Sequence, residues 1–332
     1  MKLIVQPDAG ISPLVDAIKR AKKSVDIAIF RFDLREVEKA LTTAVAGPVH
    51  VRALIAHTNK GGEKGLRKLE QRLLEAGVTV SRTADDLIRY HGKYAIIDGS
   101  ALWVLGFNTT RLDVFGSRSF GVIVTEPKLV KEATALFDAD TNKDPFKSKV
   151  SDLVVSPENA RDRLGTLIKS AKKTLAIYDP KISDGPMLRL LLDRAKDGVE
   201  VRVLGKVTLR GKGLRAAKLE KLRLHVRAIV RDGQEVFIGS QSLRGLELDR
   251  RREVGVIVRN KAVAKQVLAT FEADWEEAKP KKKDDEDDEK DQKDKKDKDK
   301  KDKEKEKDKD KDKDKDKDKD DKKDEKKEEV AT

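Results

Sequence analysis

Two short stretches of the chain combine the residue types that phosphate chemistry requires. Each has a histidine, a basic residue two positions later and an aspartate seven positions after the histidine. The residues of the two copies are His91, Lys93 and Asp98, and His225, Arg227 and Asp232. Alternate side chains of a strand point to one face, so each copy places an imidazole beside a cation. Two facing copies would suit a phosphodiester, whose oxygens accept charge-assisted hydrogen bonds and whose phosphorus needs a nucleophile and an acid.

A glycine follows each aspartate, and a second apolar run follows each glycine. Asp-Gly between two apolar runs predicts a β-hairpin turn. Asp98 and Asp232 therefore have two candidate roles. They can orient a catalytic histidine, as carboxylates do in other sites, or they can simply form the turns.

The two stretches belong to a larger internal repeat. From His91 to Val124 the sequence recurs 134 residues later without a gap, and Gly121–Val124 returns unchanged as Gly255–Val258. Upstream the offset is 150, so the first copy carries 16 extra residues between about His57 and Tyr90. Self-similarity of this extent indicates a duplicated unit.

Strand and helix patterns alternate through both copies, which predicts an α/β fold. We expect two halves related by a pseudo-twofold axis, each a mixed sheet flanked by helices. The predicted boundaries are 1–149 for the first half, 150–278 for the second half and 279–332 for a charged tail. The tail is mostly alternating Lys and Asp or Glu, and a disordered, solvated segment is expected because it has too few apolar residues for a core.

Charge and composition limit the classes of partner. Residues 1–278 carry a net charge of about +14, which favours nucleic acid or anionic lipid head groups. The 332 residues include no cysteine and four histidines, so disulfides and thiolate zinc sites are excluded and no metal site is predicted. No apolar run is long enough for a signal peptide or a membrane span, and we expect a cytoplasmic protein.

The duplicated His-x-basic-x4-Asp motif, with a Gly-Ser-x-Asn-like element after it, resembles the phospholipase D superfamily over residues 1–278. The resemblance implies attack by one histidine on a phosphodiester, a covalent phosphohistidine and protonation of the leaving group by the other histidine, with no metal or other cofactor. His91 and His225 would take these roles, His91 being the favoured nucleophile because its motif keeps the lysine. Lys93 and Arg227 would bind the phosphate.

The downstream elements depart from the family pattern in complementary ways. The first reads Leu-Gly-Phe-Asn and keeps only Asn108, whereas the second reads Gly-Ser-Gln-Ser and keeps the serine, Ser240, but not the asparagine. Glu253 has a serine as its counterpart in the first half. The predicted phosphate-binding residues are Asn108, Ser240, Ser242 and Glu253. Arg227 in place of lysine changes the geometry of the cation, so a degenerate, non-catalytic phosphate-binding protein is one alternative.

The leading hypothesis is a phospholipase D-like enzyme that hydrolyses a phospholipid or exchanges its head group. A metal-independent nuclease of the same superfamily, acting on DNA or RNA, is the rival. Peripheral contact with a membrane is left open. His50 and His57 are interpreted as packed or surface residues, and Arg118 and Arg252 as basic residues of the surface or the pocket rim.

Overall fold

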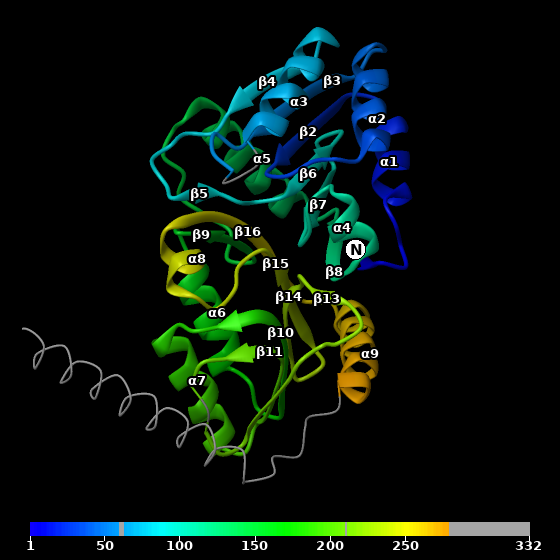
Figure 1. Ribbon diagram of the computed structural model, residues 1–332. Coiled ribbons are helices and arrows are strands. Elements are labelled where there is room, and N and C mark those ends of the chain that lie inside the picture. The colour runs from blue at the N-terminus through cyan, green and yellow to red at the C-terminus, as the bar shows by residue number, and fades with distance from the viewer. Residues whose placement is uncertain (60–62, 210, 279–332) are drawn as a thin grey trace, which may run out of the picture. The chain divides into compact units, whose positions relative to one another are not determined.

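The computed structural model describes residues 1–59, 63–209 and 211–278, all within one compact unit, Met1–Pro280. Figure 1 shows two sheets, one for each half of this unit. Both sheets contain parallel and antiparallel strand pairs. The predicted α/β fold with two mixed-sheet halves is confirmed. The predicted tail, 279–332, lies outside the described residues.

The first sheet has eight strands within the described part of the chain. Seven follow the order β1 (Lys2–Gln6), β8 (Ser117–Val124), β7 (Ala101–Leu105), β6 (Tyr94–Ile97), β2 (Ser24–Ile29), β3 (His50–Ile55) and β4 (Thr79–Arg82). The eighth, β13 (Arg223–Leu224), comes from the second half and pairs with β8. The hairpin strands β6 and β7 lie at the centre of the sheet.

The second sheet repeats this order, again with eight strands among the described residues. Seven follow the order β12 (Leu214–Ala217), β11 (Glu200–Val207), β10 (Thr174–Ile182), β14 (Arg227–Arg231), β15 (Glu235–Gly239), β16 (Arg251–Val258) and β5 (Arg89–Tyr90). The eighth, β9 (Leu153–Ser156), pairs with β16 and takes the place that β1 has in the first sheet. The sequence analysis missed β9.

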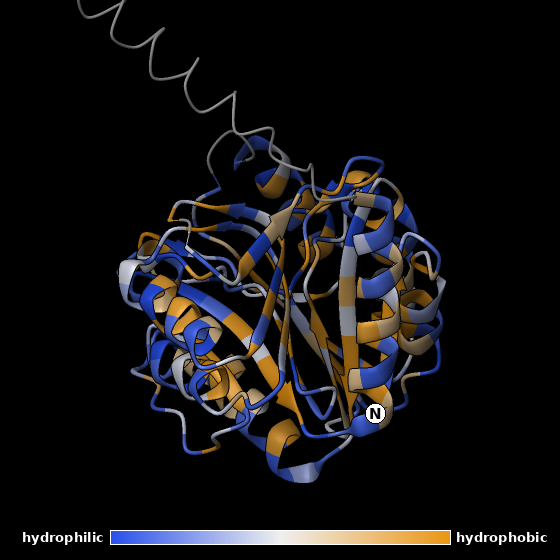
Figure 2. Ribbon diagram, turned by 90° about the horizontal axis from the view of Figure 1, so that it is seen from below, coloured by the Kyte–Doolittle hydropathy of each residue, from blue (hydrophilic) through white to orange (hydrophobic). Residues whose placement is uncertain are grey.

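Helices cover the sheets in both halves (Figure 1). They are α1 (Ser12–Lys19), α2 (Arg35–Val45), α3 (Glu63–Glu75), α4 (Arg111–Phe115), α5 (Pro127–Asn142), α6 (Ala160–Lys169), α7 (Gly185–Lys196), α8 (Gly245–Asp249) and α9 (Lys261–Ala278). The helix α3 falls in the 16-residue insertion of the first half. Figure 2 shows the apolar strands lying between helices. One core cluster joins the two halves, with Phe137 of α5 and Phe271 of α9 among its buried residues.

Each half contributes one short strand, which we call a strap, to the sheet of the other half. β5 pairs with β16 at Arg251 and Arg252, and β13 pairs with β8 at Ser117 and Arg118. Each strap leads directly into a motif histidine, because β5 ends one residue before His91 and β13 one residue before His225. This exchange places both histidines at the junction of the two sheets.

The expectation that Arg118 and Arg252 belong to the surface or the pocket rim is wrong. Arg118 donates two hydrogen bonds to Asp274 of α9, at 2.8 and 2.9 Å. Arg252 is buried and pairs with Asp140 of α5 at 3.1 Å. The two ion pairs are equivalent in the repeat, and each joins one half to the other. Their role is structural.

Candidate active site

The hairpin turns are built by Asp98 and Asp232, whose backbones take positive φ angles of 55° and 51°. Aspartate tolerates this left-handed region better than most residues. The carboxylate of Asp98 accepts backbone N–H bonds from Lys22, Lys23 and Ser24 at 2.7–3.1 Å. Asp232 does the same with the equivalent segment 172–174. Neither carboxylate contacts a histidine, so the catalytic alternative for these residues is wrong and the turn role fits the contacts.

The carboxylate partner of His91 comes instead from the second half. Nδ1 of His91 lies 2.7 Å from Oε2 of Glu253, which is fully buried on β16. The His91 and Phe30 rings pack in a T-shaped arrangement, with their centroids 4.4 Å apart. Glu253 was predicted to bind phosphate. In the structure its carboxylate contacts the His91 imidazole instead, and a carboxylate would repel a phosphate because both are anions.

His225 has a carboxylate neighbour from the first half. Its Nδ1 lies 3.6 Å from Oδ2 of Asp113 and is buried, with no hydrogen-bond partner among the residues that the structure describes. Asp113 lies on α4 and forms an ion pair with Arg223 at 2.6 Å. The sequence analysis missed Asp113 and its repeat equivalent Glu247 of α8. The signal was present, because two acids at the 134-residue offset follow the two Gly-Ser-x-Asn-like elements.

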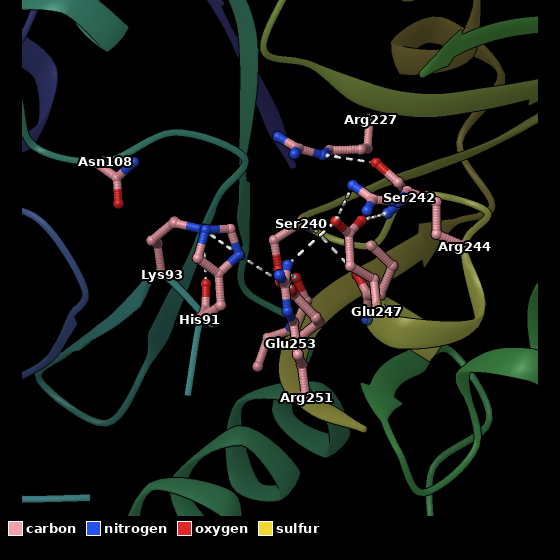
Figure 3. A network of polar contacts seen from close by, with 12 residues as sticks. His91, Lys93, Asn108, Arg227, Ser240, Ser242, Arg244, Glu247, Arg251 and Glu253 are labelled. Atoms are coloured by element: carbon pink, nitrogen blue, oxygen red, sulfur yellow. Dashed lines mark hydrogen bonds and ion pairs between the residues drawn. The ribbon is translucent and has the colours of Figure 1, made fainter. Parts of the chain in front are cut away.

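The two motif cations fold back onto their own histidines. Nζ of Lys93 donates to the carbonyl of His91 at 2.6 Å and lies 2.9 and 3.0 Å from the two ring nitrogens. Nη1 of Arg227 donates to the carbonyl of His225 at 2.7 Å. Figure 3 shows His91 and Lys93 on the first half, facing a group of second-half side chains that includes Arg227, Ser242, Glu247 and Glu253. The structure thus brings both motifs to one site.

The side chains of the three remaining predicted phosphate-binding residues differ in the groups that they contact. Nδ2 of Asn108 donates to Asp113 at 2.6 Å, and the Oγ of Ser240 is bonded to the backbone of Val254. Ser242 accepts from Nε of Arg227 at 3.2 Å, beside the motif cation (Figure 3). Of the three, Ser242 is the one whose hydroxyl lies against a motif cation. Contact of Asn108 or Ser240 with phosphate stays a prediction.

Burial and like charges keep the two histidines neutral. Burial lowers the pKa of His91 well below its usual value, and the charges of Lys93 and Arg227 lower it further. Burial and Arg227 do the same to His225, against the opposing effect of Asp113. Burial also raises the pKa of the Glu253 carboxyl, against the nearby charge of Lys93. A neutral imidazole is the form able to attack phosphorus.

Lys93 is the site cation whose charge depends on pH near neutrality, because burial lowers its pKa to about 7. An amine with a lowered pKa is charged below that value and neutral above it. Sulfate, whose charge is constant in this range, should therefore bind roughly tenfold more weakly at pH 8.5 than at pH 6, as one charge-assisted contact is lost. Isothermal titration calorimetry across this range measures the change.

Lys93→Arg is the matched control, since Arg227 already serves at the equivalent position and a guanidinium stays charged throughout. The variant should flatten the pH dependence of sulfate binding. Equal pH dependence in both proteins would contradict the assignment to Lys93.

The other histidines lie outside this site. His50 is exposed at the start of β3, and His57 is exposed after the end of the same strand. Within the described ranges, no group of three or more His, Cys, Asp or Glu side chains is arranged to hold a metal ion. No helix in the described part of the chain has the length and apolar character that a membrane span requires.

Comparison with known proteins finds a family match in both halves of the chain. A family model described as "Cardiolipin synthase, PLD-like domain" matches residues 14–141 and 164–275. These segments make up more than half of the chain, one in each half of the repeat. A search of curated proteins found no match.

Two solved structures share the fold at low sequence identity. Polyphosphate kinase from Porphyromonas gingivalis superposes with a TM-score of 0.69 and 18% identity over 82% of this chain. This chain spans half the length of that kinase chain. Phosphatidylserine synthase from Haemophilus influenzae Rd KW20 superposes with a TM-score of 0.62 and 10% identity, covering 84% of this chain and 86% of the synthase.

Proposed function

We propose that this chain, which belongs to the phospholipase D-like family, cleaves or transfers phosphodiesters through a phosphohistidine. The observation that carries the proposal is the pair of buried histidines, His91 and His225, each beside a motif cation and each facing a carboxylate from the other half. The pair supplies a nucleophile and an acid, and the cations supply charge for the phosphate oxygens.

His91 is the nucleophile in this mechanism. Its Nδ1 is held by Glu253, so Nδ1 carries the proton and Nε2 carries the lone pair; Nζ of Lys93, 3.0 Å from Nε2, leaves it when the lysine turns to the phosphate. When Nε2 bonds to phosphorus the ring becomes cationic, and the carboxylate of Glu253 stabilises that charge. Glu253 thus acts by orienting and stabilising His91, a role that Asp113 fills only loosely for His225 at 3.6 Å.

His225 serves as the acid in the first step and the base in the second. The phosphodiester's negative charge raises the pKa of a nearby imidazole, so substrate binding favours the protonated form. As the P–O bond to the leaving alcohol breaks, His225 gives its proton to the alkoxide oxygen. Water, or an acceptor alcohol, then loses a proton to His225 and attacks phosphorus, and the N–P bond to His91 breaks.

Lys93, Arg227 and Ser242 bind the phosphate oxygens in this proposal. Lys93 and Arg227 now donate to backbone carbonyls of their own histidines. Both side chains can exchange that neutral acceptor for a charged one without moving from the site. Charge-assisted bonds are the stronger, so substrate binding favours the exchange.

The substrate we favour is a phospholipid. The description of the matched family model names cardiolipin synthase, and phosphatidylserine synthase has the same fold as this chain over most of its length. The positive charge of residues 1–278 suits anionic head groups. That same charge also suits nucleic acid, which keeps a metal-independent nuclease as the second candidate.

Turnover in EDTA separates the candidates, since binding of polyanions to a basic protein does not report function. The assay compares a phosphatidyl lipid, with and without added alcohol, against single- and double-stranded DNA. The lipid proposal expects release of a free head group, or its exchange with the alcohol, and loss of both in His91→Ala. DNA cleavage with inert lipid, lost in the same variant, would replace it with the nuclease.

A further inference from the structure

Three arginines gather beside His91, on the face of Phe30 and next to Glu253. We name Arg31, Arg89 and Arg251 the arginine cluster. The guanidinium carbons of Arg31 and Arg89 lie 5.8 and 5.5 Å from the centre of the Phe30 ring, and this ring packs edge-on against His91. The cluster is therefore one aromatic ring away from the nucleophile of the proposed reaction.

The charge of the arginine cluster is only partly neutralised. Arg251 contacts Glu247 and Glu253 at 3.1 and 3.7 Å, but its Nε is buried and finds no hydrogen-bond partner in the described part of the chain. Arg31 donates to the uncharged Asn59, and neither Arg31 nor Arg89 has an ion-pair partner among the described residues. Burial, together with the charges of Arg251 and Arg31, lowers the pKa of Arg89. Like charges held together and only partly neutralised favour the binding of an anion.

The repeat shows that this surplus charge is specific to one side of the site. At the 134-residue offset the counterpart of Arg89 is Arg223, which pairs with Asp113 at 2.6 Å and donates to Ser117 at 3.0 Å. The counterpart of Phe30, at the upstream offset, is Pro180. The second half therefore has no aromatic ring at the position of Phe30 and pairs the arginine equivalent to Arg89, whereas the counterpart of Arg31, Lys181, is also basic. The two sides of the site have diverged in charge.

We propose that the arginine cluster binds a second phosphate group of the substrate, next to the phosphodiester that Lys93 and Arg227 hold. This inference rests on the proposed function and narrows its substrate class to molecules with two phosphates. Guanidinium groups match phosphate with paired hydrogen bonds. A lipid with a phosphorylated head group and a nucleotide with a neighbouring phosphate both present this chemistry.

Two matched substrate pairs test the inference and distinguish the sources. One pair is thymidine 5′-(4-nitrophenyl phosphate) with and without a 3′-phosphate. The other is phosphatidylglycerol with and without a phosphate on its head group, in mixed micelles. The wild-type protein should show kcat/KM about tenfold higher for the bisphosphate member of one pair, which identifies the source, since one further charge-assisted contact contributes about 1.4 kcal/mol.

Arg89→Ala should lower that ratio of kcat/KM values to near one, and Arg31→Ala should lower it in part. Arg215→Ala is the matched control, because Arg215 also stacks on an aromatic ring, Trp275 at 5.8 Å, but lies on the edge strand β12 and pairs with Glu200. This variant removes the same charge and should leave the ratio unchanged. A wild-type ratio near one for both pairs, or a preference that survives Arg89→Ala, would overturn the inference.

Failure of the proposed function has a different signature, namely no turnover of any of the four substrates. The arginine cluster is then tested by calorimetry with thymidine 3′,5′-bisphosphate against thymidine 5′-phosphate. Tighter binding of the bisphosphate that is lost in Arg89→Ala supports the second phosphate site without catalysis. Equal affinity of the two nucleotides contradicts it.

Discussion

Replacing His91 or His225 by alanine should lower turnover by roughly 10⁴–10⁶-fold, because residues that act as one catalytic unit fail together. The same substrate should be turned over at the wild-type rate in EDTA. Initial rates on the best substrate of the screen measure both. His50→Ala is the matched control, an exposed histidine on β3, and should change nothing. Wild-type activity in either His91→Ala or His225→Ala would rule out the two-histidine mechanism.

The two variants should differ in what they accumulate. With a 4-nitrophenyl ester, whose leaving group needs no acid, His225→Ala retains the proposed nucleophile but lacks the proposed base for water, so it should trap an acid-labile phosphohistidine at His91. Glu253→Gln keeps the size of the side chain but removes the charge that stabilises the cationic ring, and should lower kcat by roughly 10³-fold or more. A phosphohistidine found at His225 in His91→Ala would reverse the roles.

Replacing Arg118 by methionine should lower the free energy of unfolding by about 3–5 kcal/mol, because it leaves the carboxylate of Asp274 buried and uncompensated. Asp274 is 2% exposed and also accepts a hydrogen bond from Tyr178 at 2.5 Å. The Arg118–Asp274 pair joins β8 to α9, so the loss falls on the junction of the halves. Urea denaturation of the variant and the wild type measures it.

Arg72→Met is the control for this prediction. Arg72 also donates two hydrogen bonds to one carboxylate, that of Glu38, but its side chain is 50% exposed. An exposed pair contributes about 0–1 kcal/mol. If Arg118→Met costs no more than Arg72→Met, the ion pair does not hold the two halves together.

The alternating strand and helix patterns predicted the fold class, and the duplicated motif predicted that the two histidines share one site. An imidazole and a cation two residues apart, followed by Asp-Gly, predict a hairpin from local sequence alone. The hairpins of β6–β7 and β14–β15 confirm that prediction. Local periodicity also found the long helices, because an apolar stripe must face a core.

The carboxylate partners could not be found in the same way. Glu253 lies 162 residues from His91 in the sequence, and its contact depends on how the two sheets meet. The straps β5 and β13 are two residues long, too short for any periodic pattern. Because Asp98 and Asp232 belong to the motif, the sequence suggested that they lie near the two histidines. In the structure a strand separates each aspartate from its histidine, so the aspartates lie at the far end of the hairpins.

The exchange of β5 and β13 between the sheets makes the molecule the covalent equivalent of a homodimer. In a true twofold dimer every residue occurs twice in the same surroundings, so both histidines would have the same carboxylate at the same distance. Duplication within one chain removes that constraint. Glu253 faces His91, but the residue equivalent to Glu253 in the first half is Ser119. The residue equivalent to Lys93 in the second half is Arg227. The two copies of one motif can therefore differ, and in the proposed mechanism one forms the bond to phosphorus while the other moves the proton.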